Sequence, residues 1–200
     1  MSLANDTKKG AAFRMPAQRP MLETDRLILR PFAASDAPDV MRLAGDFAIA
    51  DTTLTIPHPY GDGLAEIWIA SHQSQFDQGR LINFALTLRE SGALVGSMNL
   101  VIKAEHLRAE LGYWVGKPFW KQGYCTEAAR TVVRYGFEAL GLNRIYACHL
   151  RRNPASGRVL QKLGMVSEGC QREAVVKWNR FEDLEYYGLL RRDFIEAAGR

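Results

Sequence analysis

The residues most able to do chemistry cluster between positions 110 and 126, where a strand pattern gives way to a helix pattern. A helix N-terminus leaves backbone N–H groups unpaired and carries the positive end of the helix dipole, so phosphates bind there readily. Gly123 lets the backbone approach an anion closely, Lys121 adds a positive charge, and Thr126 adds a hydroxyl. Spacing alone favours a plainer interpretation, a glycine turn with Thr126 as helix N-cap and Glu127 complementing the dipole. The segment matches neither the dinucleotide-binding fingerprint nor the Walker A pattern.

The elements that must position these residues can be predicted from apolar periodicity and from glycines at helix ends. The predicted helices run from the Ser35–Asp36 cap to residue 44 and over 64–77, 126–140 and 154–163. The predicted strands cover 27–31, 81–89, 93–102, 109–115, 144–150, 165–168, 174–178 and 185–190, with a long loop over 45–63. A hairpin beside a strand–helix–strand crossover indicates a mixed, mostly antiparallel twisted sheet flanked by helices, in an α+β or α/β domain.

Composition limits the class of protein. The 200 residues suit one domain, and 47% hydrophobic residues can form a real core. We expect a flexible N-terminal arm over residues 1–20 and a single domain over 21–200. The formal charge of +4 suits an anionic ligand, but no Lys/Arg run is dense enough to indicate nucleic acid as a partner. No apolar stretch has the length of a membrane-spanning helix, so no membrane partner is expected. The three cysteines form neither a zinc pattern nor a disulfide framework, which fits a reducing cytoplasm and no metal.

Four segments in order resemble the GNAT superfamily of acetyltransferases, and within it the branch of ribosomal-protein alanine N-acetyltransferases. They are residues 23–30, 110–114, 120–128, and 153–156 continuing through 163–165. The resemblance extends over about residues 23–194, and the ordered set is specific where one fragment would be weak. It implies the GNAT-like acyl-CoA N-acyltransferase fold and acetyl-CoA as co-substrate.

The resemblance also implies where the cofactor binds. The superfamily's pyrophosphate loop, Arg/Gln-x-x-Gly-x-Gly/Ala, falls on Trp120–Cys125, and this chain departs from it at the first and last positions. The pantetheine arm is expected between the strands 109–115 and 144–150. The implied cofactor-binding residues are Trp114, Val115, Lys121, Gln122, Gly123, Tyr124, Cys125, Thr126 and Asn153.

Two residues are implied as catalytic. Glu110 is the candidate base, acting through water on the amine, and the alternative is that it pairs with an arginine near the start of its strand. Ser156 is the candidate donor to the departing thiolate, and the alternative is an ordinary first-turn helix serine. Glu173 is a second candidate carboxylate, for which a solvated strand position is favoured.

The acceptor is expected to be a primary amine, attacked directly in a ternary complex. The branch suggests a protein or peptide N-terminal amine, and a small amine such as a polyamine, aminoglycoside or amino-acid derivative is the alternative. A non-catalytic acyl-CoA-binding module is the third hypothesis, and a homodimer stays open as the assembly. Arg151 and Arg152 are candidates for the cofactor's 3′-phosphate, and Tyr186 and Tyr187 for framing the acceptor.

Overall fold

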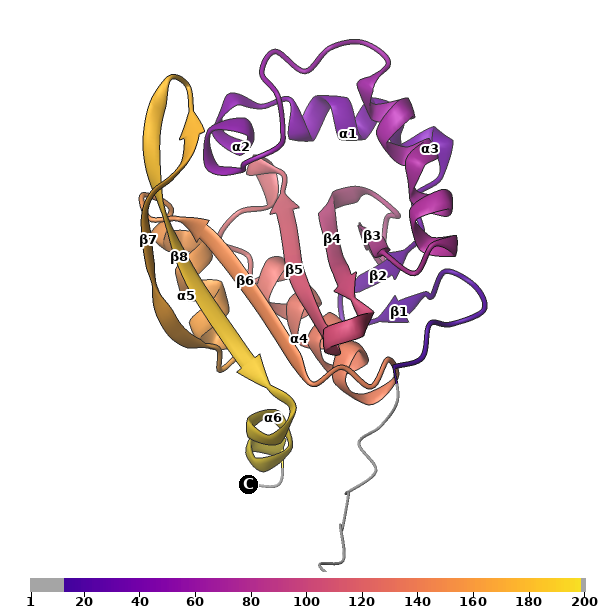
Figure 1. Ribbon diagram of the computed structural model, residues 1–200. Helices are drawn as coiled ribbons and strands as arrows, with labels where there is room; N and C mark the ends of the chain where they lie inside the picture. The colour runs from indigo at the N-terminus through magenta and orange to yellow at the C-terminus, as the bar shows by residue number, and fades with distance from the viewer. Residues whose placement is uncertain (1–12, 199–200) are drawn as a thin grey trace, which may run out of the picture.

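The computed structural model describes residues 13–198, which form one eight-stranded sheet with helices on both faces (Figure 1). The strands are β1 Leu22–Glu23, β2 Leu27–Arg30, β3 Leu81–Leu88, β4 Leu94–Lys103, β5 Arg108–Val115, β6 Arg144–Leu150, β7 Val166–Lys177 and β8 Arg180–Leu190. The α-helices are α1 Ala37–Ala44, α2 Phe47–Thr52, α3 Leu64–Asp77, α4 Tyr124–Glu138, α5 Pro154–Lys162 and α6 Arg191–Ala198. Short 3-10 helices lie at Ala34–Asp36, Ala104–His106 and Lys117–Phe119.

The sheet is antiparallel except at one junction. Its strand order is β1-β2-β3-β4-β5-β6-β8-β7, and only the pair β5–β6, joined by α4, is parallel. That parallel pairing extends over three residue pairs, from Arg108↔Arg144 to Glu110↔Tyr146. Beyond Glu110 the two strands separate, which confirms the mixed, mostly antiparallel sheet expected from the sequence and opens a gap in its middle.

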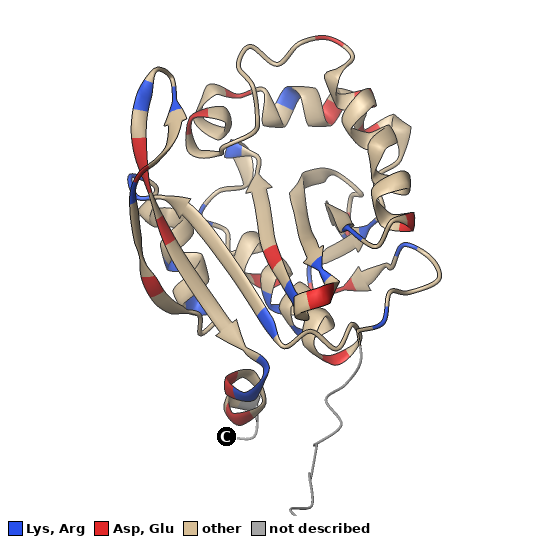
Figure 2. Ribbon diagram, viewed as in Figure 1, with Lys and Arg blue, Asp and Glu red and all other residues tan. Residues whose placement is uncertain are grey.

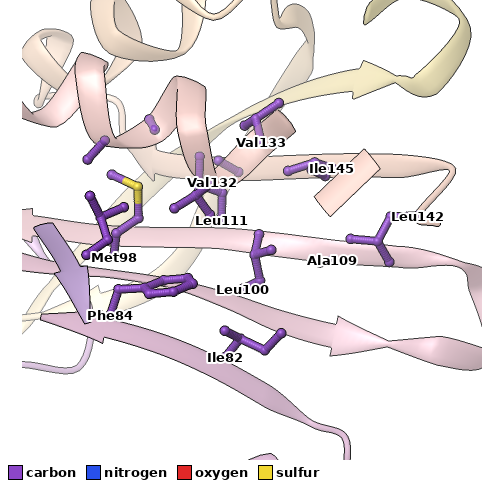
Figure 3. Close-up of a cluster of buried hydrophobic side chains, with 14 of the residues drawn as sticks. Ile82, Phe84, Met98, Leu100, Ala109, Leu111, Val132, Val133, Leu142 and Ile145 are labelled. Carbon is purple, nitrogen blue, oxygen red and sulfur yellow. The ribbon is translucent and has the colours of Figure 1, made fainter. Parts of the chain in front are cut away.

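The two faces of the sheet are covered by different helices. Side chains alternate between the faces of a strand, so Ala109 and Leu111 of β5 lie in the core beneath α4, while Trp114 lies in a second core with α1, α2 and α3. Figure 3 shows strand residues such as Phe84 and Leu100 beneath Val132 of α4. On β5, the odd-numbered residues therefore face α4, and the even-numbered residues face α1, α2 and α3.

The predicted loop over residues 45–63 is wrong at its start, because α2 occupies Phe47–Thr52. The Asp46 side chain begins this helix by accepting a hydrogen bond from the Ala48 N–H at 2.8 Å. At the preceding helix α1, Asp36 accepts from the Ala33 N–H and from Arg30, both at 2.8 Å. These carboxylates set the path of the chain from β2 into the helices above the sheet.

The C-terminal region also differs from expectation. The separate closing strands merge into one long hairpin, in which β7 and β8 are joined by the two residues Trp178 and Asn179, both with positive φ. Such a pair forms the tight turn that suits a twisted hairpin. The helix α6 follows β8 directly and was not predicted. Figure 2 shows many charged residues on this hairpin and on α6.

Part of the expected arm over residues 1–20 lies outside the described residues, which begin at 13. From there, the Arg14 N–H donates to the Leu140 carbonyl at 3.0 Å, and Phe13 and Met15 pack against the core. No helix of the described part is both long and apolar enough to cross a membrane.

Candidate active site

A large cleft passes through the sheet where β5 and β6 separate. Its volume is about 1330 Å³. It is lined by α1, α2 and the segment after it, α3, β4, β5, the end of β6, the start of α4 and α5. Glu110, Ser156 and eight of the nine residues implied as cofactor-binding line this cleft, and the exception among these is Gln122. The Gln122 side chain instead donates to the Pro118 carbonyl at 3.0 Å.

The backbone of β5 offers unpaired groups to the cleft. The Gly116 N–H donates to the Val95 carbonyl of β4 at 2.8 Å. Hydrogen-bonded pairs alternate along an antiparallel ladder, so the backbone of Trp114 faces β4, and those of Tyr113 and Val115 face the gap. The Val115 carbonyl already accepts from the Trp120 indole N–H at 2.6 Å. The groups expected at Trp114 and Val115 are therefore offered by the Tyr113 backbone and by the Val115 N–H.

The start of α4 is built around two left-handed residues. Gly123, with φ of 84°, is the N-cap, and Lys121, with φ of 61°, is exposed at the cleft. The helix begins at Tyr124, so the interpretation of Thr126 as N-cap is wrong, and its hydroxyl lies in the first turn. A glycine cap leaves the first N–H groups without a side-chain partner, which keeps them available for an anion.

Glu127 anchors this helix start to the beginning of the domain. Its carboxylate accepts from the Thr24 hydroxyl at 2.6 Å, and from the Arg26 backbone N–H at 2.9 Å and guanidinium at 2.7 Å. Burial raises the pKa of Glu127, but these hydrogen bonds outweigh burial and leave that pKa lowered. Arg26 also donates to the Gln122 carbonyl at 3.0 Å. The Glu127 carboxylate therefore fixes the turn before α4, a role additional to complementing the helix dipole as expected from the sequence.

Ser156 lies in the first turn of α5 and is held from two sides. The Asn153 side chain caps the helix by accepting from the Ser156 N–H at 3.3 Å. The Asn153 amide nitrogen also donates to the Thr52 carbonyl at 3.5 Å, so this side chain links α5 to α2. The Ser156 hydroxyl lies 2.7 Å from the Tyr113 hydroxyl. The two residues are 43 positions apart in the chain, so local sequence patterns could not predict this pairing.

Burial raises the pKa of Tyr113 well above its usual value, an effect that its hydrogen bond with Ser156 only partly offsets. The phenol therefore stays protonated. A protonated phenol can donate to the serine oxygen while the serine donates its own proton elsewhere. Burial also raises the pKa of the neighbouring Cys125 thiol to about 12, so this cysteine lines the cleft as a neutral, unreactive side chain.

Glu110 lies on the other face of the sheet, because it shares parity with Trp114 on β5. In the part of the chain that the structure describes, it forms no ion pair, so the alternative role of pairing with an arginine is wrong. The Cys148 thiol lies 3.8 Å from its carboxylate. Burial, and then the charge of Glu110, raise the pKa of that thiol to about 11. The carboxylate and the Tyr113–Ser156 pair thus flank the gap from opposite faces.

The remaining candidates lie elsewhere. Arg152 pairs with Asp51 at 2.7 Å and with Glu182 at 2.8 Å, and Arg151 pairs with Asp183 at 3.3 Å. Both arginines are therefore engaged by carboxylates rather than directed to a phosphate. Among the described residues, the lysines and arginines that line the cleft besides Lys121 are Arg158 and Lys162, which lie one turn apart on α5. Sequence reasoning missed both.

Three aromatic or acidic candidates take other positions. Glu173 lies on the exposed hairpin and does not line the cleft. Tyr187 is buried and stacks on His149 with ring centroids 5.7 Å apart. Tyr186 pairs in register with Cys148, on the face that carries Glu110. His149 lines the cleft, and its Nδ1 lies 2.8 Å from the Leu150 carbonyl.

Comparisons with known proteins agree with this geometry. The sequence model of the family described as "Acetyltransferase (GNAT) domain" matches residues 26–166. The chain is 30% identical over 175 residues to the uncharacterized N-acetyltransferase YoaA of Bacillus subtilis, covering 86% of this chain and 97% of that protein. It is 25% identical over 180 residues to the [ribosomal protein uS5]-alanine N-acetyltransferase of Escherichia coli, covering 86% and 91%. The crystal structure of a GNAT-family acetyltransferase from Bacillus anthracis superposes with a TM-score of 0.78 at 24% identity, covering 86% and 99%.

Proposed function

The chain belongs to the GNAT family of acetyltransferases and is an acetyl-CoA-dependent N-acetyltransferase, and from this premise we propose that its acceptor is the N-terminal amine of a protein or peptide. The observation that carries the proposal is the cleft through the sheet, with Glu110 on one face and the Tyr113–Ser156 pair on the other. The relative from Escherichia coli, which is named for acting on an alanine of a ribosomal protein, supports this acceptor class.

The residues present fit acetyl-CoA. The Tyr113 N–H and carbonyl and the Val115 N–H face the gap and can pair with the amides of an extended pantetheine arm, as a neighbouring strand would. The open N-terminus of α4 and Lys121 suit the pyrophosphate. Arg158 and Lys162 add positive charge at the same cleft, where the ribose phosphate can bind. When bound, acetyl-CoA supplies the activated acetyl thioester.

On the acceptor side, Glu110 accepts the proton that the amine loses on attack. An N-terminal α-amine titrates near 7.7–8.0 and a lysine side chain near 10.4. A peptide N-terminus therefore presents far more neutral amine near neutral pH, and a carboxylate acting through water is sufficient help. Glu110 is a single carboxylate without an ion-pair partner in the described part of the chain. Such a group suits a weakly basic α-amine better than a strongly basic amine.

On the leaving side, the C–S bond breaks as the C–N bond forms, and the departing sulfur needs a proton or a hydrogen bond. Ser156 donates through its hydroxyl, and the Tyr113 phenol donates in turn to the serine oxygen. A neutral serine is a weak acid, so the buried, protonated phenol behind it makes the donation easier. The Val115 N–H faces the gap and can stabilise negative charge on the carbonyl oxygen during transfer.

The test is release of free thiol from acetyl-CoA with a panel of short peptides, each offered with a free and with a blocked N-terminus. We expect turnover only with free N-termini, and mass spectrometry should place the acetyl group on the α-nitrogen. Spermidine and an aminoglycoside represent the small-amine alternative in the same panel. Turnover with these amines but with no peptide contradicts the proposed acceptor.

A further inference from the structure

We infer that the acceptor peptide carries apolar, uncharged side chains directly after its N-terminal amine, an inference that rests on the proposed function. The relevant surface is the acceptor half of the cleft, defined here as the part lined by α1, α3, residues 52–57 and the face of β4 and β5 that carries Glu110. Two independent properties of this half lead to the inference: its charge and its exposed apolar side chains.

The first property is that the acceptor half carries a single charge. Among the described residues that line it, Glu110 is the only charged side chain. The Cys148 thiol lines the cleft beside Glu110, and its raised pKa keeps it neutral. The lysines and arginines that line the cleft in the described part all lie on the cofactor side: Lys121 in the turn before α4, and Arg158 and Lys162 on α5. The strands beneath α1–α3 are mostly tan in Figure 2. One carboxylate matches one ammonium group, the amine that reacts.

The two carboxylates beside α2 are already engaged. Asp51, at the end of α2, pairs with Arg152 at 2.7 Å and accepts from Trp178 at 3.0 Å. Asp46 caps α2 and lies 4.0 Å from Lys117. Neither aspartate lines the cleft. Glu66 of α3 belongs to no ion pair of the described part, but it does not line the cleft either. A second positive charge on the acceptor would therefore meet no second carboxylate on the cleft wall, which disfavours polyamines, aminoglycosides and lysine-rich peptides.

The second property is an apolar rim. Large hydrophobic side chains exposed on a surface are unremarkable when single, but a contiguous set in a cleft marks a binding site. Four of the exposed large hydrophobic residues line the acceptor half, with exposures between 38% and 68%: Leu54, Leu64, Ile67 and Val101. They come from three separate elements, α3, β4 and the segment after α2, so the fold gathers them at one place.

The charge and the rim together select the occupant. A peptide N-terminus can place its ammonium near Glu110 and its next side chains against the rim residues. Removing that apolar surface from water favours binding, while a charged side chain at the same place would lose water without gaining a partner. The neutral hydrogen-bonding groups of the half, such as Thr53 and Asn99, remain for the peptide backbone.

The experiment compares peptides with the same N-terminal alanine and different second and third residues: Leu-Phe, Lys-Lys or Glu-Glu. We expect kcat/KM for the Leu-Phe peptide to exceed the other two by about tenfold, the order for an unpaired charge against an apolar wall. The variant Ile67→Glu adds a carboxylate to the rim and should shift the preference toward the Lys-Lys peptide. The matched control is Ile195→Glu on α6, a helical isoleucine 56% exposed and outside the cleft, which should leave the preference unchanged.

The outcomes separate this inference from the proposed function. Equal or better turnover of the Lys-Lys peptide by the parent enzyme overturns the apolar preference while leaving N-terminal acetylation intact. The preference also fails if Ile67→Glu folds but alters the three peptides equally. If every peptide is inert and phenethylamine, an apolar monoamine, is acetylated, the peptide acceptor itself is wrong.

Discussion

Replacing Tyr113 with phenylalanine tests whether the phenol takes part in proton donation. The substitution removes one oxygen and keeps the ring that packs against the core. The hydroxyl lies 2.7 Å from that of Ser156. A hydrogen bond of this kind contributes about 0.5–1.5 kcal/mol net, so its loss in the transition state lowers kcat by about 2- to 13-fold. The KM for acetyl-CoA should stay the same, because the ring is unchanged.

The decisive measurement is a double-mutant cycle on kcat with Tyr113→Phe, Ser156→Ala and the double variant, followed by thiol release. Ser156→Ala should cost about 100-fold, the lower end for general acid–base help, because a thiolate is already a good leaving group. If the phenol acts through the serine, Tyr113→Phe should change kcat by less than about twofold once Ser156 is absent. Additive losses, or an unchanged kcat in Tyr113→Phe, would refute the relay.

Two controls accompany the cycle. Tyr135→Phe removes a hydroxyl from another half-buried tyrosine, on α4 and outside the cleft, and should leave kcat unaltered. Because burial raises the pKa of Tyr113, the phenol is protonated throughout the range in which acceptor amines become neutral. Tyr113→Phe should therefore lower the whole pH–rate profile without moving its alkaline limb.

Three further predictions concern the cofactor, the acceptor and stability. Gly123→Ala places a side chain at φ of 84°, which costs about 1–2 kcal/mol. The KM for acetyl-CoA should therefore rise by at least about fivefold, and the strain should lower the melting temperature in thermal unfolding. Lys177→Met removes the buried ammonium that donates to the Leu54 and Ile56 carbonyls, and steady-state kinetics should show a raised acceptor KM with an unchanged acetyl-CoA KM, largely rescued in Lys177→Arg. Burial raises the pKa of Asp36, but hydrogen bonds to its carboxylate outweigh burial and leave that pKa lowered. The carboxylate therefore stabilises the fold above about pH 4, its pKa in the unfolded chain, and this contribution is lost as the pH falls further. Asp36→Asn should therefore melt at a lower temperature than the parent at pH 7, and the difference should shrink in acid.

The cofactor side of the site was largely predictable. Regular apolar periodicity marks β5, α4, β6 and α5, and each lies within a few residues of its predicted range. The helix α5 begins at its predicted residue, Pro154, whereas α4 begins at Tyr124, two residues before its predicted start. The short helix α2 was missed because six residues are too few for a helical period to show, and its start depends on the single side chain of Asp46.

Contacts between residues far apart in the chain could not be predicted from the sequence. The contact between Tyr113 and Ser156 exists only because a crossover returns the chain to the next strand. The hairpin turn at Trp178 and Asn179 places a tryptophan at positive φ, a choice that turn preferences alone do not favour. Its indole nitrogen donates to Asp51, 127 residues earlier, and this tertiary contact supports the unusual turn.

The contacts at that turn have a consequence for engineering the acceptor specificity. Trp178 and Arg152 both bind Asp51, and Lys177 holds the backbone just after α2, so the tip of a C-terminal hairpin supports a segment from the first third of the chain. Grafting the segment 45–63 from a relative would separate it from these partners. A chimera that keeps a native melting temperature should therefore exchange residues 176–181 together with the graft, and the two pieces form one transferable unit.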